Sequence, residues 1–401
     1  MMRTAVIGGG AAGFFLAVNL KEMIPQMEVT IFERSQRVLA KVAVSGGGRC
    51  NCTNSFRQVT DLSQVYPRGH RLLKRLFHGF DHRAAFEWFE RHGVPLVVQA
   101  DECVFPRQQD SKAIIDCFLS LARRYGVTIL TGHPIHSLDQ LNDYDFVAVT
   151  TGGSPREEGL RWLQEAGHEI VSPVPSLFSF SIDDARLQAL QGLVANRATL
   201  FLPSTSFRAE GPLLITHWGL SGPAVLKLSS YAARHLATHD YQAPLGINWL
   251  SMSESDILAL LHDTSERQPQ KHLATVNPFG LSQRLWTLLL ETALNQRAAL
   301  RWNELGKKDM NRLVNILSNH TCQITGRAPF KDEFVTCGGI ALSSVNPKTL
   351  ESRFVPRLYF AGEVLDIDGI TGGFNFQAAW TTAYTVAHSI KESILHCQYR
   401  P

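Results

Sequence analysis

The chain has 401 residues, more than one hydrophobic core usually supports, and this length predicts two or three domains. It carries 39 Lys and Arg residues against 36 Asp and Glu residues, which gives a formal net charge of +3. Because so small a charge does not favour a polyanionic partner, we expect a small-molecule substrate and neither nucleic acid nor membrane as a partner. Composition leaves the oligomeric state unknown.

The cysteine pattern and the start of the chain indicate where the protein works. Seven cysteines, at positions 50, 52, 103, 117, 322, 337 and 397, have neither the density nor the pairing of a disulfide framework. The opening "MMRTAVIGGG" has one basic residue and a short apolar run, which is neither a signal peptide nor a membrane span. We therefore expect a cytoplasmic protein.

The first 33 residues have the order strand, glycine turn, helix, strand. An apolar strand at 3–8 is followed by "GGGAAG" and then by "FFLAVNLKEM", which has helical periodicity. Gly8 permits the tight turn, Gly10 lets the backbone approach a pyrophosphate, and Gly13 allows close packing of helix on strand. The second strand ends at Glu33, whose carboxylate can accept hydrogen bonds from an adenosine ribose. The unit predicts a bound dinucleotide, with a plain Gly-rich turn as the alternative.

The stretch "SGGGRCNCTN" at 45–54 follows soon after the second strand, so we expect it near the bound cofactor. Its glycines let backbone amides face a ligand, and Asn51 and Asn54 add amide donors and acceptors. A phosphate cradle would be followed by an apolar helix, which "RQVTDLSQVYP" does not resemble. The C-x-C pair is at most half a zinc site and lacks the C-x-x-C spacing of a redox dithiol. A loop along a flat ring such as a flavin remains, beside an ordinary surface loop.

Two later strands also end in glycine. One is "YDFVAVTTGGS" at 144–154, and the other lies in "RLYFAGEVLDIDGITGGFNFQAAWTTAYTVAHSI" at 357–390, where a glycine-rich loop leads into a helix from about Phe376. This second helix start offers another phosphate-facing or ring-facing site. The return of the chain to the first domain favours a flavin over NAD alone.

The middle of the chain reads as an insertion. Alternating runs from 176 to about 250 predict strands of a small barrel or sandwich, and 252–320 turns helical, with Ser253 or Ser255 as a cap. Strand-like segments resume at 321–336. The predicted fold class is α/β, a Rossmann-like FAD-binding domain with an inserted β-barrel domain that itself carries a helical subdomain. The predicted domains are FAD-binding, 1–175 and 344–401; β-rich, 176–251 and 321–343; and helical, 252–320.

Taken together, the motifs resemble the bacterial FAD flavoprotein family labelled BaiN-like NAD(P)/FAD-dependent oxidoreductase or aminoacetone oxidase. The resemblance rests on "IGGGAAG" at 7–13, "KVAVSGGGRCNCTN" at 41–54, "TTGG" at 150–153, "THWGLSGPAVLKLS" at 216–229, "VTCGGIAL" at 335–342 and "AGEVLDIDGITGGFNFQAA" at 361–379. These motifs run in order through nearly the whole chain. After TTGG, however, "SPREEGLRWLQEAGH" goes almost directly into a helix, so the resemblance does not extend to a longer loop there that would contact substrate or a second nucleotide.

The resemblance implies FAD as the cofactor and NADH or NADPH as a transient electron donor. The candidate FAD contacts lie in the glycine-bearing segments and beside them: Gly8, Gly10, Ala11, Ala12, Gly13, Glu33, Arg34, Lys41, Gly47, Asn51, Asn54, Ile135, Thr151, Gly152, Gly362, Glu363, Gly373, Asn375, Phe376 and Gln377.

Two residues are candidates for catalysis. His217 follows an apolar strand and precedes a Gly-Leu-Ser-Gly turn, where it could exchange protons with substrate or only bond a loop carbonyl. Arg49 could stabilise a reduced flavin or anchor an acidic substrate, or only brace the glycine loop. Trp218, Phe374 and Phe376 are candidates for stacking near the ring, with core packing as the alternative.

Three functions follow. The first is an NAD(P)H-driven reductase of a conjugated carbon-carbon double bond, and the second is an amine oxidase that uses O2. The third is a non-catalytic or RNA-associated flavoprotein, which the near-neutral charge disfavours. The absence of a second G-x-G-x-x-G disfavours a dedicated NAD(P) domain.

Overall fold

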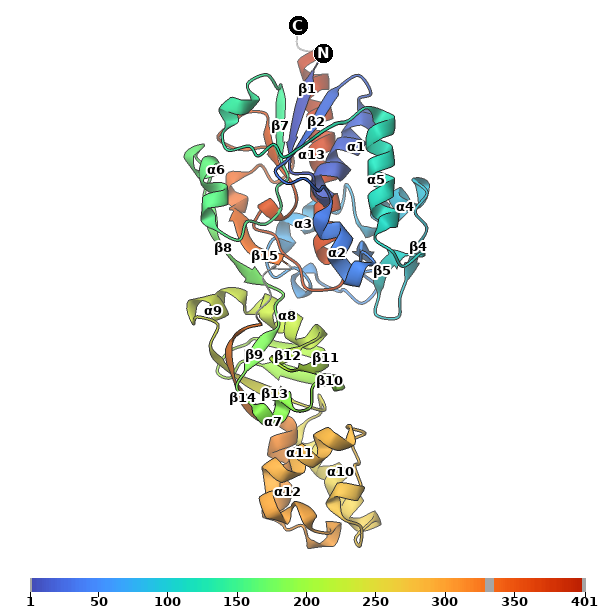
Figure 1. Ribbon diagram of the computed structural model, residues 1–401, viewed down its shortest axis with the longest axis vertical. Coiled ribbons are helices and arrows are strands. Elements are labelled where there is room, and N and C mark those ends of the chain that lie inside the picture. Colours follow the sequence, from blue (N-terminus) through green and yellow to red (C-terminus); the bar gives the residue numbers. More distant parts are fainter. Residues whose placement is uncertain (1, 329–334, 399–401) are drawn as a thin grey trace. The chain divides into compact units, whose positions relative to one another are not determined.

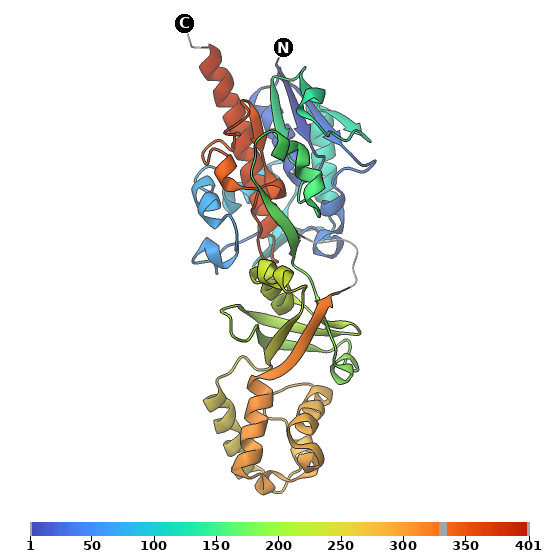
Figure 2. The same cartoon turned by 90° about the vertical axis from the view of Figure 1, so that its left-hand side faces the viewer.

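The computed structural model describes residues 2–328 and 335–398 (Figures 1 and 2). The chain divides into two units, one of Met1–Pro175 with Val335–Pro401 and one of Ser176–Phe334. The second unit is therefore inserted into the first, and each is described by itself.

The first unit is built on a parallel sheet with the strand order β16-β7-β1-β2-β6. Its strands are β1 (Arg3–Ile7), β2 (Glu28–Glu33), β6 (Thr128–Thr131), β7 (Phe146–Val149) and β16 (Leu358–Phe360). The C-terminal strand pairs with β7, so both ends of the sequence contribute to one sheet. The carboxyl ends of these strands are where such folds bind ligands.

Helix α1 (Ala11–Met23) packs against both α5 (Lys112–Tyr125) and the long α13 (Phe374–Gln398), which runs beside it in Figure 1. Every α1 residue from Ala12 to Leu20 is buried. A helix apolar on all sides must be covered on all sides. The helix that begins the cofactor motif is thus held between the sheet and the last helix of the chain.

Smaller elements complete the first unit. The helices are α2 (Ala40–Gly48), α3 (His70–Leu76), α4 (His82–Arg91) and α6 (Arg161–Glu165). The strands form a three-stranded sheet, β3 (Thr53–Asn54), β5 (Cys103–Pro106) and β4 (Leu96–Val98), and a pair, β8 (Ile170–Ser176) with β15 (Val335–Ile340).

The second unit contains a closed barrel with the strand order β10-β11-β12-β9-β14-β13. The strands are β9 (Phe180–Ile182), β10 (Val194–Phe201), β11 (Arg208–Thr216), β12 (Gly219–Ser221), β13 (Ala243–Asn248) and β14 (His320–Arg327). Closure leaves no unpaired sheet edge. Three helices that the sequence did not predict lie among these strands: α7 (Ala185–Gln188), α8 (Pro223–Tyr231) and α9 (Ala233–Thr238).

Between β13 and β14 the chain forms α10 (Glu254–Arg267), α11 (Gln283–Leu294) and α12 (Lys307–Ser318). Ser253 is the N-cap of α10, where its hydroxyl accepts from the Asp256 N–H. The helices share one apolar core with the barrel, which includes Trp249, Trp286 and Leu317.

The predicted fold class is confirmed: the Rossmann-like domain carries an inserted barrel, and the barrel carries helices. The segment 321–343 is predicted as the return of the β-rich insert, but the structure divides it between the two units. The part from Val335 onward pairs with β8 in the first unit, because β8 leaves that unit and β15 re-enters it side by side. The predicted residues 329–334 lie outside the described part. Within the described residues, no helix has both the length and the apolar character to span a bilayer.

Candidate cofactor and active site

The glycine turn after β1 is held by direct backbone contacts. Gly8 has φ 111°, and a Cβ there would lie 2.5 Å from the Thr150 carbonyl oxygen. A Cβ on Gly13 would lie 2.0 Å from the Gly8 carbonyl oxygen, so the first turn of α1 leaves no room for a side chain. Thr150 also donates its hydroxyl to the Ile7 and Gly8 carbonyls at 3.0 Å. The turn is rigid because strand ends β1 and β7 and helix α1 meet at it.

Gly10 differs from its neighbours because its open side faces no protein atom. It is the N-cap of α1, no side chain caps this helix, and a Cβ at Gly10 would have nothing within 4 Å. The amides of the first turn therefore keep their positive end accessible, which is the arrangement that binds a diphosphate. Ala11, Ala12 and Gly13 add only small groups beside these amides. The turn thus fits the diphosphate of FAD.

Glu33 lies where a ribose of that diphosphate would be expected. Its Oε2 accepts from the Gly9 N–H at 2.9 Å, and its Oε1 accepts from the Ser35 N–H at 2.8 Å. Each oxygen keeps a further lone pair for a hydroxyl. Arg34, next to it, is exposed, and Ile135 follows β6, whose residue Thr131 pairs with Glu33. These three candidates thus lie at the carboxyl ends of two neighbouring strands.

The stretch 45–54 begins in the last residues of α2, where Ser45, Gly46 and Gly47 leave helical φ/ψ, and continues as a loop. Gly46, Gly47 and Gly48 all have positive φ, and Cβ atoms on Gly47 and Gly48 would meet nothing within 4 Å. Positive φ favours glycine, so the run of three glycines has a backbone reason. Gly47 and Gly48 therefore leave their backbone amides uncovered by side chains, on the same loop as Asn51. The loop thus has the form expected beside a flat ligand.

The asparagines of this stretch connect it to the loop before α13. Asn51, with its amide oxygen turned to accept, takes a hydrogen bond from the Gly373 N–H at 3.1 Å and donates to the Thr53 carbonyl. Asn54 donates its Nδ2 to the Gly372 carbonyl at 3.0 Å. A Cβ on Gly373 would lie 2.2 Å from the Thr53 carbonyl oxygen. The opening stretch and the C-terminal glycine loop are therefore in direct contact.

Glu363 joins three other segments of the predicted site. Its Oε2 pairs with Lys41 Nζ of α2 at 3.0 Å, and its Oε1 accepts from the Thr336 N–H of β15 at 2.7 Å. A Cβ on Gly153, after β7, would lie 2.7 Å from Oε1, and one on Gly152 would lie 3.8 Å from Oε2. Next to it, a Cβ on Gly362 would lie 2.9 Å from the Ala12 Cβ of α1. Glu363 thus lies where the segments that carry the motifs converge.

Two side chains at the start of α13 that are predicted to contact the cofactor also bond protein groups. Gln377 is fully buried and accepts from the Thr53 hydroxyl at 2.6 Å. Asn375 uses both amide atoms on the Gly369 backbone, each at 2.8 Å. These two side chains hold the loops in place. Because these side-chain amides are already bonded within the protein, the predicted contacts of both residues with FAD remain a prediction for their backbone groups.

The two aromatic candidates at the start of α13 differ in burial and in their ring contacts. Phe376 stacks on Trp380 with an interplanar angle of 9° and remains half-buried. Phe374 is buried and packs edge-on against Phe56 and Tyr66. Phe374 is therefore a core residue, and Phe376 has one face committed to Trp380.

The cysteines of the C-x-C pair are buried thiols. Burial raises the pKa of Cys50 to about 12 and that of Cys52 well above its usual value. The thiolate is the reactive form, so such thiols are unreactive near neutral pH. These environments favour a packing role over a redox role for both residues.

The catalytic candidates lie in different units. Arg49 donates from Nε to the Gly46 carbonyl at 3.1 Å and lies over the Phe105 ring at 4.3 Å, so its observed contacts brace the glycine loop. His217 is exposed on the turn between β11 and β12 in the second unit, with its ring against Trp218 at 4.4 Å. Thr151 is exposed after β7.

Sequence reasoning missed two contributors to the site's framework. Tyr66 is fully buried and donates its hydroxyl to the Phe374 carbonyl at 2.9 Å. Arg68 forms a two-point ion pair with Asp368, whose side chain is fully buried. A carboxylate inside "LDIDGITGG", amid apolar residues, is the signal that a cationic partner was needed.

The fold and these glycine-lined strand ends define a dinucleotide-binding protein of the Rossmann type. The family described as HI0933-like protein Rossmann domain matches residues 2–389, and the chain belongs to this family. The predicted resemblance is confirmed, and with it the class of FAD-dependent oxidoreductases.

Two curated relatives match almost end to end. One is the ribosomal RNA dihydrouridine synthase of Haemophilus influenzae, 26% identical over 96% of this chain and 97% of the relative. Another is the 3-dehydro-bile acid delta(4,6)-reductase of Clostridium scindens, 25% identical over 98% of this chain and all of the relative.

Solved structures with some similarity include a 3-ketosteroid delta1-dehydrogenase from Sterolibacterium denitrificans, at 10% identity and a TM-score of 0.47, covering 98% of this chain and 100% of that one. A quinol-fumarate reductase with menaquinol matches at 11% identity and a TM-score of 0.49, covering 100% of this chain and 73% of that one.

Proposed function

We propose that the protein reduces a carbon-carbon double bond conjugated to a carbonyl group, with NADH or NADPH as the electron donor. One observation carries this proposal: two full-length relatives with unlike substrates are named for the same change of bond. Dihydrouridine differs from uridine by two hydrogens across a double bond conjugated to a ring carbonyl. The name of the other relative likewise describes reduction of double bonds conjugated to a 3-keto group.

The residues divide this task between cofactor and substrate. FAD, if bound here, would supply the hydride-transfer chemistry that links the nicotinamide donor to the alkene carbon. The α1 amides with Gly10 would hold its diphosphate, and Glu33 would hold a ribose. The 45–54 loop and Gly372–Gly373 would fix the ring through backbone groups.

Completing the reduction requires a proton as well as a hydride. We propose His217 as the group that supplies the proton, because imidazole is a frequent general acid and this side chain is exposed on the turn between β11 and β12. Arg49 remains a candidate for charge stabilisation through the loop that it braces.

Anaerobic stopped-flow spectroscopy tests the proposal. Mixing the FAD-loaded protein with NADH or NADPH should bleach the flavin band, and a conjugated enone added next should restore it. If neither donor bleaches the flavin band, the proposed reductase activity is contradicted. Peroxide formed from an amine panel in air, with no enone turnover, would support the oxidase in its place.

A further inference from the structure

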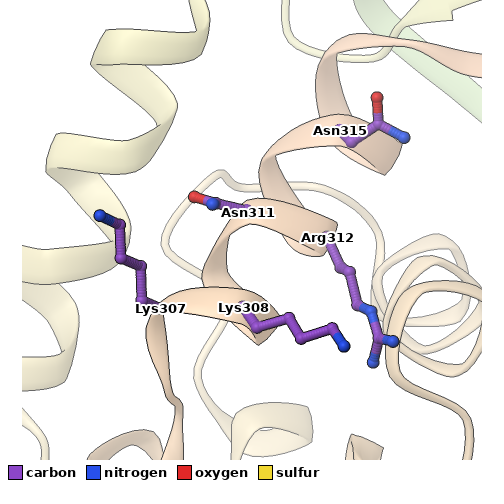
Figure 3. Close-up of a pocket in the computed structure, with 5 residues that line it drawn as sticks. All are labelled: Lys307, Lys308, Asn311, Arg312 and Asn315. Carbon is purple, nitrogen blue, oxygen red and sulfur yellow. The ribbon is translucent and has the colours of Figure 1, made fainter.

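The helical part of the second unit has a basic depression along one face of α12. Five exposed side chains line it, with a volume of about 530 Å³: Lys307, Lys308, Asn311, Arg312 and Asn315. Figure 3 shows Lys307 and Asn311 extending to one side of the helix, and Lys308 and Arg312 to the other. The spacing of four residues within each pair places its members one turn apart. No carboxylate lines this depression.

The nearest acid on the helix does not cancel this charge. Asp309 is buried and is bonded by Arg297 at 2.8 Å, with Arg312 at 3.7 Å. Its negative charge is therefore already matched by two guanidinium groups. Lys307 and Lys308 have no carboxylate partner within ion-pair distance among the described residues.

The two lysines at the start of α12 oppose the helix dipole, although Asp309 in the same turn agrees with it. In α10, by contrast, the first turn has the Ser253 cap and the acids Glu254 and Asp256. In α12 the cap is Gly306, no side chain caps the helix, and two lysines precede the one acid of the first turn, Asp309. Positive charge at this end of a helix opposes its dipole, so the lysines lower the stability of α12. A local rule broken without a structural gain is expected at a functional surface.

We infer that this depression, here called the α12 basic face, binds the phosphodiester backbone of RNA. Lys307 and Lys308 are adjacent, and Arg312, which Asp309 shares, lies one turn beyond Lys308, so these cations can contact neighbouring phosphates. Asn311 and Asn315 add hydrogen bonds of the kind made to phosphate and sugar. No exposed large hydrophobic side chain lies on α12, so the face lacks the apolar anchor of a membrane-binding helix. The net charge of +3 does not reveal this face, because acidic residues elsewhere in the chain offset its positive charge.

A neighbouring groove marks one edge of the α12 basic face. Asn311 and Asn315 also line a depression of about 330 Å³ shared with Glu254, Ser255 and Leu258 of α10. Because Glu254 would repel phosphate, the backbone is expected to follow the lysine side of α12. This inference rests on the proposed function in one respect: RNA would be the polymer that carries the reducible base.

The test is binding of a labelled RNA hairpin to the full FAD-loaded protein, followed by fluorescence anisotropy at several salt concentrations. The test variant is Lys307→Glu with Lys308→Glu, and the matched control is Lys271→Glu with Lys348→Glu. Both variants change the net charge equally, and all four lysines are exposed. Acids at the start of α12 agree with its dipole, so the test variant should fold.

We expect the test variant to bind RNA at least about tenfold more weakly at low salt, and the control within about twofold of the parent protein. The slope of log affinity against log salt should fall in magnitude by about 1.4 to 1.8. Equal loss in both variants would mean attraction by net charge alone and would overturn the inference. So would an unchanged slope, or tighter binding of anionic vesicles or an acidic peptide than of RNA.

A separate measurement keeps this inference apart from the proposed function. Reduction of a free enone by the same variants does not use the α12 basic face, so it should be unchanged. RNA binding without enone reduction would contradict only the proposed reductase activity. Enone reduction without RNA binding would contradict only the inference about the α12 basic face.

Discussion

Lys41 and Glu363 lie 322 residues apart in the sequence, yet Nζ and Oε2 are 3.0 Å apart in the folded protein. The ion pair connects α2, whose last residues begin the 45–54 stretch, with the segment just after β16. Lys41 is 57% exposed, so solvent screens the pair. The other oxygen of Glu363 receives the Thr336 N–H in a less exposed position.

Lys41→Met should lower the free energy of unfolding by less than about 1 kcal/mol, because the ion pair is screened. Glu363→Ala should cost about 1 to 3 kcal/mol, since it also removes the acceptor of the Thr336 N–H. Urea unfolding of both single variants and the double variant measures this difference. Equal costs for the two single variants would contradict the assignment of the amide contact as the stronger one.

Gly13→Ala and Gly10→Ala should have opposite effects. A Cβ at Gly13 would meet the Gly8 carbonyl at 2.0 Å, so Gly13→Ala should destabilise the apoprotein by at least about 2 kcal/mol, despite about 1 kcal/mol gained in helix propensity. A Cβ at Gly10 meets nothing, so Gly10→Ala should cost at most about 1 kcal/mol.

Gly10→Ala should nevertheless weaken FAD binding by about tenfold or more, because the methyl group would occupy the approach of the diphosphate. Thermal unfolding of the apoproteins and calorimetric titration with FAD separate the two effects. Unchanged FAD affinity in the Gly10 variant would place the diphosphate elsewhere.

The buried ion pair of Arg68 and Asp368 gives a prediction about stability. Asp368→Ala should cost about 3 to 5 kcal/mol, because it leaves a guanidinium with 15% exposure without its buried carboxylate. Arg68→Met combined with Asp368→Leu should cost clearly less, since no buried charge remains. Denaturant unfolding decides this, and a double variant as unstable as Asp368→Ala would show that the pair itself is stabilising.

The buried Cys50 thiol predicts a loss of stability in alkali. Its pKa is raised from the ordinary value of 9.0 to about 12 by burial. Above pH 9 the unfolded chain releases this proton while the folded protein keeps it, so stability falls with rising pH up to about 12. The slope contributed by Cys50 should approach about 1.4 kcal/mol per pH unit.

Cys50→Ala should reduce that alkaline slope, whatever it does to stability at pH 7. The comparison is urea unfolding of the parent and the variant from pH 8 to 11. If the slopes coincide, Cys50 is not shielded as the structure places it. Iodoacetamide should also leave Cys50 unmodified in the folded protein at pH 7.5.

His217→Gln should separate two halves of the proposed reaction. Proton supply is needed only when the enone is reduced, so enone turnover should fall by about 100-fold or more while bleaching by NADPH keeps its rate. If both rates fall together, or neither changes, His217 is not the proton donor.

The sequence predicted the parts of the fold that follow from local backbone chemistry. Gly8 and Gly13 are required by close approach of backbone atoms, and that requirement can be inferred from spacing alone. Helix α8 was missed because "PAVLKLSSY" follows a Gly-Leu-Ser-Gly turn in a region of alternating strands, and only Pro223 at its first position marks its start.

The sequence indicated which segments meet at the candidate site but not what the individual side chains bond. Asn375 and Gln377 lie in the predicted motif, but their amides bond protein groups, and spacing in a sequence does not reveal whether a polar atom is already bonded. The α12 basic face was likewise hidden in a near-neutral composition. Pairing of Asp309 with Arg297 and Arg312, which leaves Lys307 and Lys308 uncompensated, becomes visible only in three dimensions.

The most direct test of the proposed reaction is the mass of the product. The FAD-loaded protein should be incubated anaerobically with NADPH and a cyclic enone, and separately with an RNA fragment that contains uridine. A gain of two hydrogen atoms by either substrate, matched by oxidation of one NADPH, is the predicted result. Oxidation of NADPH with no change in the mass of any conjugated substrate would contradict the proposal.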